Sequence, residues 1–92
     1  MDYFDYVPDY INQGLAKLPG NERDAVFTAL EAQFEVGVDM IYRDGPYDIR
    51  EEFEGILQND CHAEPFCDDM YVNFGEPRCD ELTKIFFPDV KL

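Results

Sequence analysis

One apolar stripe in the middle of the sequence constrains the fold more than any other feature. Small or apolar residues recur there at intervals of three and four, at Val26, Leu30, Phe34, Gly37 and Ile41. This spacing returns to one side of an α-helix, whereas a half-buried strand would alternate at every second residue. The stripe therefore predicts a helix of about four turns with one buried face, and Gly45-Pro46 is expected to end it.

Shorter apolar patterns on either side of the stripe predict further helices. Residues 7–18 have helical spacing, and Pro8 suits the first turn of a helix. Pro19-Gly20 is expected to end that segment, and Asn21 is expected to cap the central helix. After the stripe, another helix is expected to begin at Asp48.

The C-terminal third gives a weaker signal. Residues 60–64 are polar and predict a loop, while residues 70–74 combine helical spacing with strand-like alternation. Gly75-Glu76-Pro77 breaks the chain. Leu82, Ile85 and Phe86 predict a last short helix, and residues 85–87 fit a strand equally well. We therefore expect a mainly α fold, a small compact helical domain of three to five helices. The alternative is an α+β fold with one or two short C-terminal strands.

The length and the charge of the chain limit its possible functions. Residues 1–92 contain no linker or repeat and are expected to form a single acidic globular domain. Seven Lys and Arg oppose 21 Asp and Glu, which gives a formal net charge of −14, well beyond the magnitude of about 2 to 8 typical of a small soluble domain. Such a charge disfavours direct binding to nucleic acid or to an anionic membrane. It favours attraction to a positively charged partner.

Cysteine usage and the absence of targeting signals predict a cytoplasmic protein. No apolar run approaches the roughly 20 residues needed to span a bilayer. The first residues lack the basic and apolar regions of a signal peptide. Three cysteines, an odd number without an export signal, fit a reducing compartment better than a disulfide scaffold.

Residues of metal-ligating types are present but poorly spaced. Cys61, His62, Cys67 and Cys79 could each bind zinc, yet they lack the C-x2-C pairs that direct two sulfurs at one ion. The acidic residues near this segment do not match the calcium loop of an EF-hand. We expect no metal and no other cofactor. A small zinc-stabilised domain centred on these four residues is the alternative.

Catalytic signatures are also weak. The sequence contains no Ser, and carboxylate pairs arise by chance when acidic residues are this frequent. Cys61 and His62 are neighbours in sequence, and a Cys–His catalytic pair would need an orienting group in space. We therefore expect that the protein is not an enzyme.

Acidic residues recur on two of the predicted helices. On the central helix they are Asp24, Glu31, Glu35 and Asp39, with a rise of about 6 Å for every four residues. On the following helix they are Asp48, Glu51, Glu52 and Glu54. The basic residues are too few to neutralise these rows, so we expect the eight side chains to contact a partner, with Tyr42 and Tyr47 beside them.

With its acidic rows at positions 24/31/35/39 and 48/51/52/54, the chain resembles the small acidic inhibitors made by phages and mobile elements. These include DNA-mimic anti-restriction proteins and several anti-CRISPR proteins. The resemblance covers the whole chain in size, charge and character, without a shared motif. It implies a non-enzymatic inhibitor whose partner is a basic nucleic-acid-binding protein or a CRISPR or restriction complex. If a phage encodes the protein, this partner lies in the bacterial host cytoplasm.

Aromatic residues near the N-terminus support a different class of function. Tyr3, Phe4, Tyr6 and Tyr10 place four rings within ten residues, which is more than a small core is expected to hide. They would form the docking patch of an acidic adaptor or subunit, or the face of a homodimer.

Overall fold

The computed structural model describes the backbone of residues 3–44 and 48–91 and the side chains of residues 3–37 and 48–91. The elements are η1 (Tyr3–Asp5), α1 (Asp9–Ala16), α2 (Gly20–Asp44), α3 (Ile49–Leu57), α4 (Asp60–Phe74) and α5 (Arg78–Phe86). Since the described residues contain five α-helices and no strand, the predicted mainly α fold is confirmed and the α+β alternative is wrong. Within the same residues, no helix is both long enough and apolar enough to cross a membrane.

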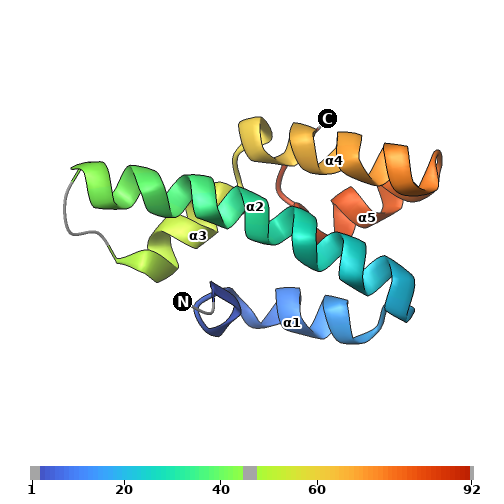
Figure 1. The fold of residues 1–92 in the computed structure, drawn as a ribbon, viewed down its shortest axis with the longest axis horizontal. Coiled ribbons are helices and arrows are strands. Elements are labelled where there is room, and N and C mark those ends of the chain that lie inside the picture. The colour runs from blue at the N-terminus through green and yellow to red at the C-terminus, as the bar shows by residue number, and fades with distance from the viewer. Residues whose placement is uncertain (1–2, 45–47, 92) are drawn as a thin grey trace.

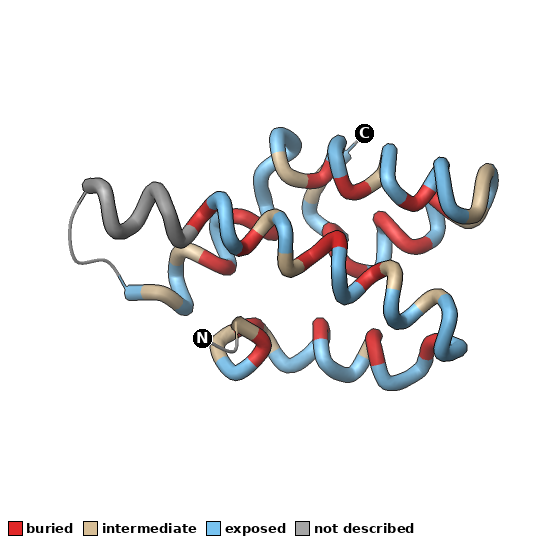
Figure 2. The backbone as a smooth tube through the Cα atoms, in the orientation of Figure 1, coloured by how far each residue is buried: buried red, intermediate tan, exposed pale blue. Residues whose placement is uncertain are grey.

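Helix α2 is the longest element, and the other helices are arranged around it (Figure 1). Its 25 residues extend about 37 Å at 1.5 Å per residue, close to the 39 Å length of the whole molecule. Helices α1, α3 and α4 each pack against α2, and α4 also packs against α5. One side of α2 is left without a covering helix, and most of its residues there are exposed (Figure 2).

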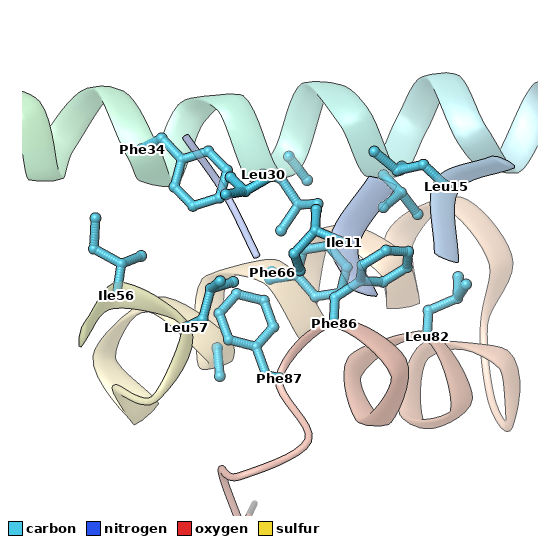
Figure 3. Close-up of a cluster of buried hydrophobic side chains, with 14 of the residues drawn as sticks. Ile11, Leu15, Leu30, Phe34, Ile56, Leu57, Phe66, Leu82, Phe86 and Phe87 are labelled. Carbon is cyan, nitrogen blue, oxygen red and sulfur yellow. The ribbon is translucent and has the colours of Figure 1, made fainter. Parts of the chain in front are cut away.

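The predicted apolar stripe forms the α2 side of the core. Val26, Leu30 and Phe34 are fully buried, and the Phe34 ring centroid lies 4.7 Å from that of Phe53 on α3. The labelled side chains of the other helices converge on the same region (Figure 3). The stripe prediction is confirmed as far as Gly37, whereas Ile41 and Gly45-Pro46 lie outside the residues whose side chains are described.

The two predicted helix starts have different outcomes. Asp48 caps α3 as expected, because its side chain accepts the backbone N–H of Arg50 at 3.0 Å. The predicted cap at Asn21 is wrong. Helix α2 begins one residue earlier, and the Pro19 carbonyl accepts the N–H of Arg23 at 2.8 Å.

The predicted loop at residues 60–64 is also wrong, because these residues form the first turns of α4. The Asn59 side chain accepts the N–H of Cys61 at 2.9 Å and caps the helix. Pro65 lies inside α4 and removes one backbone donor. The helix nevertheless continues, and it buries Ala63, Phe66 and Met70 against the core. The strand considered for residues 70–74 is therefore wrong as well.

A glycine turn reverses the chain between α4 and α5. Gly75 has φ 70°, a backbone conformation that residues with a side chain rarely adopt. Its N–H is donated to the Tyr71 carbonyl at 2.8 Å. The chain then returns as α5 along α4, and both Phe86 and Phe87 are buried at the end of α5. The predicted chain break is confirmed, and the strand considered for residues 85–87 is wrong.

Candidate functional site

The uncovered side of α2 carries three of the predicted carboxylates, Asp24, Glu31 and Glu35, which we call the outward row. Residues separated by four and seven positions share one helix face, so the row extends about 16 Å along α2. Asp24 and Glu35 are exposed and Glu31 is half-buried. Successive residues of an α-helix are rotated by about 100° around its axis, so the outward row lies on the opposite side of α2 from Val26 and Leu30. The structure therefore brings these three predicted residues together.

No basic side chain pairs with the outward row in the part of the chain that the structure describes. Arg78 forms the ion pairs found there, with Glu22 and Glu81. Arg23 donates instead to the Leu18 carbonyl at 3.3 Å, and the Arg50 guanidinium lies over the Tyr6 ring, 5.6 Å from its centroid. Arg23, Arg50 and Arg78 thus have other partners, and within the described residues the carboxylates of the row have no basic partner.

Some of the predicted partner-binding residues lie outside the described side chains. Asp39 belongs to the backbone of α2, but its side chain is not among those described. The same holds for Tyr42, and Tyr47 lies in the segment between α2 and α3 that is not described. The outward row is therefore defined only as far as Glu35.

The structure does not gather the acidic residues of the third helix into one row. Asp48 serves as the cap of α3 and Glu51 is exposed. Glu52 lines a hollow with residues of α2 and α4, whereas Glu54 lines a different hollow beside α1 and the C-terminal segment. Successive residues of a helix point about 100° apart, so these neighbours diverge around the helix axis.

Helix α4 carries an acidic row that the sequence reasoning missed. Asp60, Glu64 and Asp68 recur every four residues, and all three are exposed. We call them the α4 row. The reading of residues 60–64 as a loop hid this periodicity, although the spacing itself was visible in the sequence.

A hollow between α2 and α4 extends the acidic surface. Its α2 wall consists of small residues, including Ala25, Thr28 and Ala32. Asp24 of the outward row lies on this wall, and Asp69 of α4 lies on the opposite wall. Both carboxylates are exposed. The hollow therefore carries one exposed carboxylate from each helix, Asp24 from α2 and Asp69 from α4.

The N-terminal aromatic residues mostly belong to the core. Phe4 is buried and stacks on Phe27 with ring centroids 4.4 Å apart. Tyr3 and Tyr6 are partly buried and pack against the core. Only Tyr10 among the four is exposed, at 37%. The expectation that a small core could not hide this cluster is therefore wrong for three of the four rings.

The structure does not bring together the four candidate zinc ligands, which are Cys61, His62, Cys67 and Cys79. Cys61 is exposed on α4, and Nδ1 of His62 lies 2.9 Å from the Gln33 Oε1 atom of α2. Burial lowers the pKa of His62 below its usual value. Cys67 and Cys79 instead lie beside Asp80, where α4 meets α5. Asp80 was not predicted as a ligand, since it becomes a neighbour of Cys67 only through the turn at Gly75.

Comparisons with known proteins identify no relative. No protein-family model, no curated protein and no solved structure matches this chain.

Proposed function

We propose that the protein is a non-enzymatic binding inhibitor whose acidic surface mimics nucleic acid. Its target is the basic DNA- or RNA-binding groove of a bacterial defence complex, of the CRISPR or restriction type, or of another DNA-binding protein in the cytoplasm. The observation that carries this proposal is the outward row, a set of carboxylates on one helix with no basic partner among the described residues.

The geometry of the acidic surface supports this proposal. Carboxylates four residues apart on a helix are separated by an axial rise of about 6 Å, whereas each strand of duplex DNA places one phosphate per roughly 3.4 Å of axis. The outward row alone is therefore a sparser array than a DNA strand. Asp69, across the hollow between α2 and α4, adds charge beside Asp24. A basic groove would meet a two-sided acidic surface and not a single line of charge.

Long-range electrostatics support the same proposal. The net charge of −14 attracts a basic groove and accelerates encounter with it at low ionic strength. Lys and Arg side chains that normally contact phosphates would contact the carboxylates instead. Binding of this kind weakens as salt increases, because exposed charges are screened.

The experiment is a displacement assay with purified defence complexes. A panel of DNA-guided, RNA-guided and restriction complexes is bound to fluorescent nucleic acid, and the protein is added at increasing concentration. We expect the anisotropy of the probe to fall with at least one complex, with a higher half-maximal concentration at higher salt. If no complex in the panel releases its nucleic acid, the proposal that the protein inhibits a defence complex is wrong.

Two matched charge reversals locate the docking surface. In one variant, Glu31→Lys is combined with Glu35→Lys, and we expect displacement to weaken roughly 10-fold or more. The control combines Asp9→Lys with Asp89→Lys, two exposed carboxylates outside α2 and α4, and it changes the net charge equally. The control is expected to retain most of the displacement. Equal losses in both variants would show that only net charge matters and would contradict the role of the outward row.

A further inference from the structure

Two thiols and a carboxylate meet where α4 packs against α5. Cys67 belongs to α4, and Cys79 and Asp80 belong to the first turn of α5. The two sulfurs and one Asp80 oxygen lie within 4.8 Å of one another. Asp80 Oδ1 is 4.0 Å from Cys67 Sγ and 3.9 Å from Cys79 Sγ. We call these three residues the thiol cluster.

We propose that the thiol cluster binds a zinc ion that joins α4 to α5, with Cys67, Cys79 and Asp80 as its protein ligands. Thiolate sulfur and carboxylate oxygen are both common ligands of zinc, and a water molecule would complete the tetrahedron. This inference replaces the expectation of no metal site. It also replaces the alternative ligand set that included Cys61 and His62. It is independent of the proposed function, because it involves none of the residues of the outward row.

The two sulfur–oxygen distances in the cluster are close to those of a tetrahedral zinc site. Bond lengths of about 2.3 Å to sulfur and 2.1 Å to oxygen place two sulfurs about 3.8 Å apart, and a sulfur and an oxygen about 3.6 Å apart. The two sulfur–oxygen distances exceed that ideal by a few tenths of an ångström. Asp80 is exposed, so a small rotation of its side chain can close the gap without disturbing the core.

Zinc binding requires both sulfurs of the cluster as thiolates, because a coordinating thiol is deprotonated. Binding would therefore break two S–H bonds and release two protons to the solvent.

Two lysines lie near the thiol cluster without forming an ion pair with Asp80 among the described residues, so the Asp80 carboxylate is available to a metal ion. Lys84 and Lys91 line the same hollow as Asp80. Neither forms an ion pair with it within the described residues, where the basic partner in both ion pairs is Arg78. Asp80 instead contacts the two thiols. A metal ion at the cluster would thus not need to displace a salt bridge.

The test measures zinc binding by the full chain, kept reduced and supplied with excess magnesium to occupy weak carboxylate sites. We expect one zinc per chain after dialysis and a release of two protons per zinc in weak buffer. At a free zinc concentration about 100 times the dissociation constant, the melting temperature should rise by roughly 10 °C. A wild-type protein that binds no zinc, or that binds it without releasing protons, would overturn the proposal.

Single substitutions distinguish the cluster from the rest of the acidic surface. Cys67→Ser and Asp80→Asn should each weaken zinc binding at least about 100-fold. Neither residue is buried, so both variants are expected to fold. Cys61→Ser removes an exposed thiol of the same helix and should bind zinc like the wild type. Unchanged binding in Cys67→Ser and Asp80→Asn, or a loss in Cys61→Ser, would contradict this ligand set.

Discussion

Glu22 and Glu35 lie on the same helix in different electrostatic surroundings. Glu22 accepts the Arg78 Nε–H at 3.1 Å, and its side chain is only 17% exposed. Glu35 is exposed on the outward side of α2, where no ion pair forms within the described residues. The chain therefore pairs Arg78 with a carboxylate near the start of α2, whereas no basic partner of the outward row is found among the described residues.

Stability alone does not explain the outward row. Like charges four residues apart on a helix destabilise it by a few tenths of a kcal/mol per pair, and Glu31 and Glu35 form such a pair. The inward side of the same helix stabilises the fold, because it buries Val26, Leu30 and Phe34 completely. The two sides of α2 are thus expected to respond differently to substitution.

The largest expected effect is on the inward side. Phe34→Ala should lower the free energy of unfolding by about 3–5 kcal/mol, because it leaves a cavity between Phe4 and Phe53. Urea denaturation followed by circular dichroism measures this change. Phe27→Ala, at a ring that is 39% exposed, is the control and should cost less than half as much. A loss below about 1 kcal/mol for Phe34→Ala would contradict the described core.

A smaller effect is expected where α2 approaches α3 closely. A Cβ atom at Gly37 would overlap with Ile56 Cδ1, so Gly37→Ala forces Ile56 to move and should destabilise the protein by about 1 kcal/mol. Gly55→Ala is the matched control on α3, since a Cβ there meets no atom within 4 Å. It should stabilise the protein by up to about 1 kcal/mol through helix propensity. The same sign for both variants would contradict the close approach.

Removing the charge of Glu22 tests how much its ion pair with Arg78 stabilises the protein. Glu22→Gln keeps the shape of the side chain but weakens its contact with Arg78, and it should cost about 1 kcal/mol of unfolding free energy. Glu81→Gln is the comparison, because Glu81 lies 3.7 Å from the same arginine with a side chain that is 55% exposed. It should cost only a few tenths of a kcal/mol. Equal costs would show that burial does not strengthen the Glu22 contact.

The smallest effect is expected on the outward row. Glu31→Gln combined with Glu35→Gln should raise the unfolding free energy by a few tenths of a kcal/mol, because it removes a like-charge pair. Added salt should reduce this gain, since screening weakens the same repulsion in the wild type. Thermal melts at low and high salt measure both changes. A clear loss of stability would mean that these carboxylates have structural partners.

The sequence predicted the elements that depend on local pattern. The stripe from Val26 to Gly37 identified α2 because its buried residues repeat with the helical period. The predicted start of α3 at Asp48 is confirmed, and the structure shows that the Asp48 side chain caps this helix within its first turn. Helix α4 was missed in part, since its first turns are polar and contain Pro65. Its buried residues begin to repeat only at Ala63.

The candidate sites were less predictable, because they depend on how the helices pack. Glu52 and Glu54 could have been separated by the 100° rotation per residue alone. The meeting of Cys67 with Asp80 required the reversal at Gly75, and no spacing rule for zinc ligands includes it. The pairing of Glu22 with Arg78 likewise depends on the return of α5 beside α2.

The most direct test of the central claim is the salt dependence of binding. Once the displacement assay identifies a partner, the affinity of labelled protein for the nucleic-acid-free partner is measured over a range of salt concentrations. The account predicts a steep loss of affinity with salt for the wild type and a clearly shallower dependence for the variant with Glu31→Gln and Glu35→Gln. Identical slopes for the two proteins would contradict the claim that the outward row binds the basic groove.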